Sequence, residues 1–313
     1  MIDAADQKPD HGGGIDAAIA QFGGTRAGWI DLSTGINPIP YPLGDLPADA
    51  WNALPDTGAF ARLETAARCF WTIPDAAAVL PAPGASALIA RMPTIALPGP
   101  VHIPAPTYNE HARAFAAQGW TSDDDAQTRV IVHPNNPDGR LWQASDLTQT
   151  TIIDESFCDV TPNATLIEHA IRPNTIILKS FGKFWGLAGL RLGFAIGDPT
   201  LIAKLAHSIG PWAVSGPALE IGTRALNDPA WATQTRTRLA ADAARLDAML
   251  NLPVVGGTTL FRLYDTTDAA ALQTRLARAH IWTRIFPYST RWLRLGLPGT
   301  PDHWARLQQA LAA

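Results

Sequence analysis

The chain has 313 residues, of which 47% are hydrophobic and 17% charged, and this length suggests about two globular domains. A net charge of -4 offers no basic surface for a nucleic-acid backbone, so we expect no nucleic-acid partner. The sequence starts without the basic and apolar regions of a signal peptide, and no apolar stretch is long enough to span a membrane, so we expect a cytoplasmic protein without a membrane partner.

The N-terminal segment, residues 1–40, is rich in Gly and Asp and lacks enough large hydrophobic residues for a core of its own. We expect it to form an arm that packs with the small domain. Cys69 and Cys158 are the only cysteines, which is too few for a disulfide framework or a four-cysteine zinc site. We therefore expect reduced thiols and no metal.

Residues 41–215 form the predicted large domain. Short apolar runs alternate here with helix-like stretches and polar turns, along the segments Ala87–Met92, Tyr108–Gln118, Arg129–Val132, Thr151–Asp154 and Thr175–Lys179. This alternation is typical of βα units and predicts an α/β fold with a mainly parallel mixed sheet. Ligands bind at the carboxyl edge of such sheets, so polar residues at the strand ends are the candidate site residues.

Residues 216–313 form the predicted smaller α+β domain. The pattern changes here to a long helix at Trp231–Leu250, an apolar segment at Thr259–Tyr264 and a helix near Ala269–His280. A second alternating segment, Trp292–Leu297, precedes a last helix that starts at Asp302.

Lys183 is the most informative of the four lysines, the others being Lys8, Lys179 and Lys204. It directly follows a predicted strand and has aromatic and glycine neighbours. Such surroundings remove water and favour the neutral amine that imine formation needs. Ser180 and Arg191 flank the lysine, and a hydroxyl and a guanidinium are suited to holding a phosphate beside it.

Other polar residues follow the neighbouring strands. Asp154 ends a strand 29 residues before Lys183, which leaves room for one crossover helix between two adjacent strands. A carboxylate there could keep a pyridine nitrogen protonated. Asn136 precedes Pro137 and could donate its amide to a ring oxygen, while Gly84, Ala85 and Ser86 open a helical stretch whose amides could approach a phosphate.

Together these residues resemble the fold-type I pyridoxal-5'-phosphate (PLP) enzymes, and among them the histidinol-phosphate aminotransferases, over nearly the whole chain. The resemblance implies that Lys183 carries PLP as a Schiff base and that Asp154 binds the pyridine nitrogen. It also implies that Asn136 binds the ring oxygen and that Tyr108 stacks on the ring. Ala85, Ser86, Ser180 and Arg191 match the phosphate-binding residues, and Arg294, in Leu293–Gly296, matches the arginine that grips the substrate carboxylate.

Two residues depart from that family's pattern. Phe157 stands where the subgroup usually has a tyrosine that bonds the ring oxygen, and Leu54 stands where a tyrosine usually reaches the neighbouring subunit's phosphate. The resemblance still implies a homodimer, since the family's sites form at subunit boundaries.

A narrower resemblance comes from His11–Gly14 and from Asp31–Pro38, which are similar to segments of the threonine-phosphate decarboxylases of cobalamin biosynthesis. It implies a carboxy-lyase that converts L-threonine O-3-phosphate into (R)-1-aminopropan-2-yl phosphate, with Asn37 and His11 binding the phosphorylated amino-acid substrate. A histidinol-phosphate type aminotransferase and a non-catalytic binding module with the same fold remain alternatives.

Overall fold

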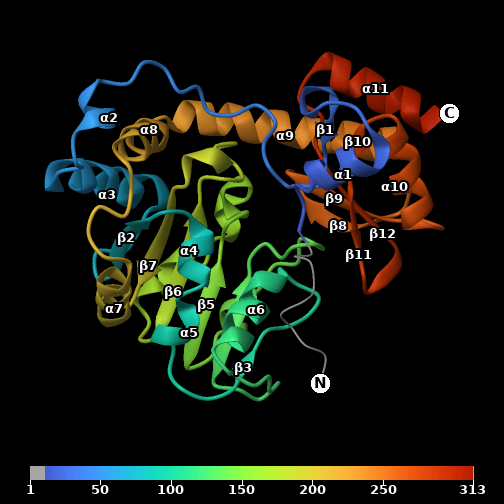
Figure 1. Cartoon of the computed structure of the whole chain (residues 1–313). Coiled ribbons are helices and arrows are strands. Elements are labelled where there is room, and N and C mark those ends of the chain that lie inside the picture. Colours follow the sequence, from blue (N-terminus) through green and yellow to red (C-terminus); the bar gives the residue numbers. More distant parts are fainter. Residues whose placement is uncertain (1–10, 313) are drawn as a thin grey trace. The chain divides into compact units, whose positions relative to one another are not determined.

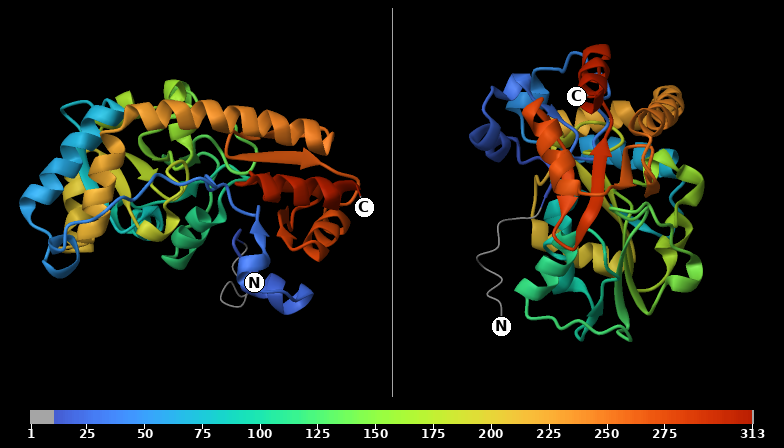
Figure 2. Two further views of the ribbon diagram at one scale, coloured as in Figure 1. Left: turned by 90° about the horizontal axis from the view of Figure 1, so that it is seen from above. Right: turned by 90° about the vertical axis from the view of Figure 1, so that its right-hand side faces the viewer.

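The structure, a computed structural model, describes residues 11–312, so Lys8 and the first ten residues of the predicted arm lie outside it. The chain divides into two compact units, residues 39–239 and residues 11–38 together with 240–312. The boundary falls within α9 (Pro229–Leu250), which is one continuous helix in Figures 1 and 2, whereas the sequence pattern placed a boundary at residue 216. The division into an arm and two domains stays a prediction.

Unit 39–239 is built on a six-stranded mixed sheet (Figure 1). Its strand order is β2-β7-β6-β5-β4-β3, in which β3 to β6 run parallel to one another and β7 is antiparallel to both of its neighbours. The strands span β2 (Ala78–Ala82), β3 (Val101–His102), β4 (Thr128–Val132), β5 (Thr150–Asp154), β6 (Thr175–Ser180) and β7 (Gly193–Gly197). The predicted α/β fold with a mainly parallel mixed sheet is confirmed.

Seven α-helices lie wholly within this described unit: α2 (Asp49–Asn52), α3 (Thr57–Trp71), α4 (Ala85–Ile89), α5 (Met92–Ile95), α6 (Asn109–Ala117), α7 (Pro199–Ile209) and α8 (Gly216–Leu226). Residues of α4 to α7, among them Leu88 and Phe115, form one buried cluster with Val130, Ile152 and Ile176 of the sheet. Burying both faces of β4 to β6 explains their continuous β-branched sequences.

The prediction of one crossover helix between β5 and β6 is wrong. Three short 3₁₀ helices connect these strands: η3 (Cys158–Val160), η4 (Pro162–Ala164) and η5 (Ile167–Ile171). Pro162 has no backbone N–H for a helical hydrogen bond, and the Leu166 N–H donates to the Glu155 carboxylate at 2.6 Å instead. The connection is therefore tied to the end of β5.

The second unit contains a four-stranded antiparallel sheet of order β11-β12-β9-β8 and a small parallel pair of β1 with β10. Its strands are β1 (Ile30–Asp31), β8 (Val254–Thr258), β9 (Phe261–Asp265), β10 (Ile281–Trp282), β11 (Arg284–Phe286) and β12 (Ser289–Gly296). Its helices, besides part of α9, are α1 (Ile15–Phe22), α10 (Ala269–Arg278) and α11 (Pro301–Ala312).

The strands and helices predicted in the C-terminal part are confirmed within a few residues. Residues 11–38 join this unit through β1 and through the Gly296 N–H, which donates to the Leu32 carbonyl at 2.7 Å. Helix α10 packs on β12 and on α11 (Figure 2). Over residues 11–312, no helix is both long enough and apolar enough to cross a membrane.

Candidate active site

A pocket at the carboxyl ends of β4, β5 and β6 gathers most of the candidate residues of unit 39–239. The cavity has a volume of about 110 Å³. Its lining residues are Ala85, Ser86, Ile89, Tyr108, Val132, Asn136, Asp154, Ser156, Phe157, Ser180, Gly182, Lys183, Ala188 and Arg191. Residues that are distant in sequence thus meet at the sheet edge where open α/β proteins bind their ligands.

Lys183 lies in the loop after β6 and is partly exposed to this pocket. Its amine lies 5.3 Å from the centre of the Phe157 ring, which is buried. Lys179, four residues earlier, is only 2% exposed and donates to Glu155, while Lys204 is exposed on α7. Of the three lysines in the described part of the chain, only Lys183 lines this pocket.

Asp154 is the last residue of β5 and is 2% exposed. Its Oδ2 lies 2.9 Å from His111 Nε2, and its Oδ1 accepts hydrogen bonds from the Ser156 backbone N–H at 2.9 Å and from Ser156 Oγ at 2.5 Å. Burial acts to raise the pKa of Asp154, but the hydrogen bonds from His111 and Ser156 outweigh it, so the pKa falls below its usual range. The carboxylate is held ionised inside the pocket.

Sequence reasoning missed both partners of Asp154. His111 lies on α6 and is fully buried, and its ring makes an edge contact with Tyr108 at 6.1 Å between centres. The signal was the three-residue spacing from Tyr108, which places two residues on one side of a helix start. Ser156 follows Asp154 by two residues, the spacing at which an Asp side chain commonly binds a nearby backbone N–H.

A cationic group lies beside the start of α4. A Cβ at Gly84 would come within 2.6 Å of Arg191 Nη2, so only glycine allows the guanidinium to approach this closely. Gly84 also has a φ of +89°, which favours glycine. Ala85 and Ser86 follow it in the first turn, and Ser180 lies in the same pocket. The arrangement is suited to binding an anion such as a phosphate.

Asn136 and Tyr108 complete the pocket wall. The loop under Asn136 is fixed by Asn135, whose amide donates to the Pro106 carbonyl at 2.9 Å and to Asp138 at 2.7 Å. Tyr108 directly precedes α6. Burial, followed by the charges of Asp154 and Glu110, raises the pKa of Tyr108 to about 12, so its phenol stays neutral near pH 7. A neutral aromatic ring at this place could stack on a planar ligand.

The three predicted substrate-binding residues, Arg294, Asn37 and His11, lie in the other unit. Arg294 on β12 is 5% exposed; its Nη2 donates to the Ser33 carbonyl at 2.6 Å, and its guanidinium lies 5.0 Å from the centre of the Phe261 ring. Burial, together with Arg284, lowers the pKa of Arg294 to about 10, which still leaves it protonated near pH 7. It can therefore bind a carboxylate.

Ser33 connects the two N-terminal segments singled out in the sequence. Its Oγ accepts a hydrogen bond from the Gly13 N–H at 2.6 Å and donates to Asp31 at 2.6 Å. A Cβ at Gly12 would lie 2.4 Å from the Ser33 carbonyl oxygen, so the glycine segment packs closely against this turn. His11 is half-buried at the start of that segment, and Asn37 is 1% exposed. Ser33 and Asp31 were not predicted to have these roles.

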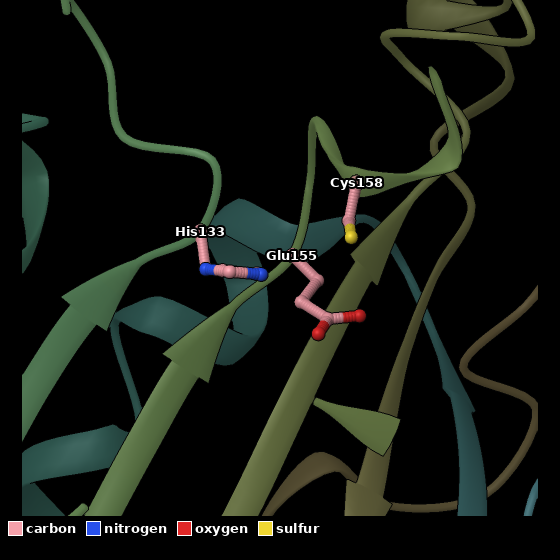
Figure 3. Close-up of side chains that lie close together, drawn as sticks. All are labelled: His133, Glu155 and Cys158. Atoms are coloured by element: carbon pink, nitrogen blue, oxygen red, sulfur yellow. The ribbon is translucent and has the colours of Figure 1, made fainter. Parts of the chain in front are cut away.

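A second group of potential ligand atoms, from His133, Glu155 and Cys158, lies close together (Figure 3). His133 Nδ1 accepts from the Trp142 backbone N–H at 3.0 Å, and its Nε2 donates to the Ala164 carbonyl at 2.6 Å. Glu155 accepts from Lys179, Thr165 and Leu166. Burial also raises the pKa of the Cys158 thiol, which keeps it protonated. Hydrogen bonds thus already occupy the atoms that would bind a metal.

Comparison with known proteins agrees with this geometry. Residues 122–311 match the model of the family described as aminotransferase class I and II. A threonine-phosphate decarboxylase from Sinorhizobium sp. is 40% identical over 96% of this chain and 97% of its own length. A threonine-phosphate decarboxylase from Pseudomonas aeruginosa is 38% identical with the same coverage of both chains.

The structure is also similar to that of histidinol-phosphate aminotransferase from Sinorhizobium meliloti in complex with pyridoxal-5'-phosphate. The TM-score is 0.82 at 19% identity, and the match covers 99% of this chain and 98% of the other. At this sequence identity the similarity supports a shared fold and nothing further. By the family model and the two relatives, the chain belongs to the class I and II aminotransferases and, among them, to the group of the threonine-phosphate decarboxylases.

Proposed function

We propose that this protein is a PLP-dependent carboxy-lyase that converts L-threonine O-3-phosphate into (R)-1-aminopropan-2-yl phosphate and CO2, a step of cobalamin biosynthesis. The observation that carries the proposal is the match to two relatives named threonine-phosphate decarboxylase, at 40% and 38% identity, over 96% of the chain. The match extends over nearly the whole chain in both cases, and so over residues of both units.

The pocket residues fit the proposed cofactor. PLP offers an aldehyde, a pyridine nitrogen, a ring oxygen and a phosphate, and the pocket contains an amine, a buried carboxylate, an amide and a guanidinium: Lys183, Asp154, Asn136 and Arg191. Gly84, Ala85, Ser86 and Ser180 would hold the phosphate with Arg191, and Tyr108 would cover the ring. When bound, PLP supplies an electron sink for the electron pair released at the substrate Cα.

Asp154 has the charge needed for this chemistry. Because His111 and Ser156 keep it ionised, it would hold a proton on the pyridine nitrogen and so favour electron withdrawal from the substrate Cα. In decarboxylation the bond from Cα to the carboxylate carbon breaks, CO2 leaves, and one proton is added to Cα. Lys183, the amine in this pocket, is our candidate to deliver that proton.

Arg294 would bind the substrate carboxylate until the bond breaks. Its protonated guanidinium is already oriented by the Ser33 carbonyl and the Phe261 ring. We assign Asn37 and His11 to substrate binding as well, since the segments that carry them meet at Ser33 in the same unit as Arg294. Holding the carboxylate and the substrate phosphate at fixed points would select which bond at Cα lies perpendicular to the cofactor ring.

We further propose that the protein is a cytoplasmic homodimer. The segment of residues 43–54 carries three exposed apolar side chains. Their exposed fractions are 49% for Leu43, 71% for Trp51 and 68% for Leu54. We take this segment as the candidate interface, because large exposed apolar patches mark sites of protein interaction. Sedimentation of the holoenzyme tests this: a dimer is expected, and a monomer at micromolar concentration would contradict it.

Incubation of the PLP-loaded protein with L-threonine O-3-phosphate tests the proposed reaction. We expect release of CO2 in the absence of 2-oxoglutarate and retention of the amino group in the product. Transfer of the amino group to 2-oxoglutarate without CO2 release would instead identify an aminotransferase of the histidinol-phosphate type.

A further inference from the structure

A group of buried charged residues lies beside the pocket without lining it. Successive residues of a strand point to opposite faces, and both strand ends show this alternation. Asp154 and Ser180 line the pocket, whereas their neighbours Glu155 and Lys179 bind each other at 2.6 Å and are at most 2% exposed. Asp159 on η3 is 4% exposed, and Lys179 Nζ lies 3.7 Å from its Oδ1.

Asp159 makes contacts to several separate segments of unit 39–239. Its Oδ1 accepts from the Trp71 indole N–H at 2.8 Å, and its Oδ2 accepts from the Trp185 indole N–H at 3.1 Å. Its backbone carbonyl accepts from Arg236 Nε at 2.7 Å. Burial raises the pKa of Asp159, while the charge of Lys179 and the two indole donors act in the opposite direction. A buried carboxylate with this many donors is costly to bury and is expected to fix the groups that it binds.

Trp185 is the contact that leads to the site, because it follows Lys183 by two residues. Its ring is completely buried and stacks on Phe181 at 5.1 Å and on Trp231 at 5.3 Å between ring centres. Its backbone carbonyl accepts from the Tyr41 N–H at 2.9 Å. Stacking fixes the plane of the Trp185 ring but lets the ring slide or turn within that plane. The hydrogen bond to Asp159 fixes which edge of the ring faces the buried carboxylate.

The loop around Lys183 is short and internally bonded, so the position of Trp185 affects the lysine. The Gly186 N–H donates to the Lys183 carbonyl at 3.1 Å, and the Leu187 N–H donates to the Phe181 carbonyl at 3.1 Å. We call residues 181–187 the Lys183 loop.

We propose that Asp159 is a positioning residue, which holds the Lys183 loop in place for cofactor binding through its hydrogen bond to the Trp185 indole. The inference rests on the proposed function only in taking PLP as the ligand of Lys183. Asp159 itself is absent from the pocket lining, so the proposed role is to position the loop and not to bind the cofactor.

The two indoles provide a matched pair of variants. Trp185→Phe and Trp71→Phe each remove one N–H donor from the same carboxylate and leave a six-membered ring in place, but only Trp185 belongs to the Lys183 loop. Amide hydrogen exchange of the apoprotein, read out by mass spectrometry, reports the loop without requiring a cofactor. The PLP dissociation constant, measured from the visible absorbance of the bound cofactor, reports the consequence at the site.

In Trp185→Phe we expect faster exchange in residues 181–187 and a PLP dissociation constant raised about tenfold, the size of effect expected for loss of one buried hydrogen bond. In Trp71→Phe both quantities should stay within about twofold of the wild type, even if the two variants lose similar stability. If Asp159→Asn folds, it should resemble Trp185→Phe.

Equal effects of the two tryptophan variants, or unchanged exchange in the Lys183 loop, would overturn the proposal and leave Asp159 a purely structural residue. The outcome is separate from the identity of the reaction. A wild-type protein that binds PLP but does not decarboxylate L-threonine O-3-phosphate would contradict the proposed function while leaving the contrast between Trp185 and Trp71 intact.

Discussion

The pocket in unit 39–239 and the Arg294 region in the other unit are built in different ways. The pocket takes its polar groups from the ends of adjacent parallel strands, where Asp154 and Ser180 follow directly from the strand register. Arg294 instead lies within an antiparallel strand and is oriented by Ser33, which is 261 residues away in the sequence. The first arrangement follows from the sheet topology, whereas the second depends on where a distant segment packs.

We infer that the two regions have different roles in the reaction, which steady-state kinetics can test. Residues of the pocket should act on the bond-breaking step, so their variants should lower kcat. Residues around Arg294 should act on substrate binding, so their variants should mainly raise KM.

The largest effect is expected for Lys183→Ala, which removes the only amine in the described pocket. Activity should fall to background, and the visible absorbance of the lysine-bound cofactor should disappear. Lys204→Ala on α7 is the matched control and should keep both, since Lys204 is exposed. Survival of the absorbance band in the Lys183 variant would show that the cofactor is attached elsewhere.

Asp154→Asn should lower kcat about 100-fold or more, because the amide cannot hold a proton on the pyridine nitrogen. The KM for substrate should change much less. Asp198→Asn is the control, since Asp198 caps α7 and also has a lowered pKa but lies outside the pocket. If the two variants had the same kcat in steady-state assays, Asp154 would have no role in the reaction.

Arg294→Lys should raise KM roughly 10- to 100-fold with a smaller change in kcat, because lysine cannot make two parallel hydrogen bonds to a carboxylate. Arg262→Lys on the neighbouring strand β9, where Arg262 pairs with Asp247 at 2.9 Å, should leave KM unchanged. A kcat defect without a KM defect in the Arg294 variant would remove the distinction between the two regions.

The smallest effect concerns the pH dependence of apoprotein stability. The pKa of Asp154 is lower in the folded than in the unfolded state, so its ionisation stabilises the fold. This contribution to the free energy of unfolding is fully present above the unfolded-state pKa of about 4 and is lost as the pH falls through the folded-state pKa. The unfolding free energy of the wild type should therefore exceed that of Asp154→Asn by a constant amount above about pH 5, and the gap should narrow below pH 4. Urea titrations at several pH values measure this gap, and a gap that widened in acid would contradict the assignment.

The sequence was sufficient for the parts of the fold that depend on local pattern. The runs at Val130–Val132 and Ile152–Ile153 are short, apolar and β-branched, and they became β4 and β5 with Asp154 at the predicted edge. Local sequence pattern does not predict the 3₁₀ connection after β5. That connection depends on the hydrogen bond that the Leu166 N–H donates to the Glu155 carboxylate, eleven residues earlier.

The sequence predicts which residues form the site, but it does not predict the hydrogen bonds that connect them. Lys183, Asp154, Asn136 and Arg191 were identified one by one and lie in one pocket. The spacing from Tyr108 places His111 on the same side of the helix start, but its hydrogen bond to Asp154 depends on where α6 lies relative to the end of β5, which the spacing does not specify. Phe157, at the position where the family usually has a tyrosine, lines the pocket, and its ring centre lies 5.3 Å from the Lys183 amine.

The proposed decarboxylation is tested most directly by product analysis after turnover of L-threonine O-3-phosphate in D2O. We predict an aminopropanyl phosphate that has lost the carboxylate carbon, keeps its amino group and carries one deuterium at the former Cα, with one CO2 released per product. Recovery of the full carbon skeleton with the amino group lost would contradict the account and identify amino transfer instead.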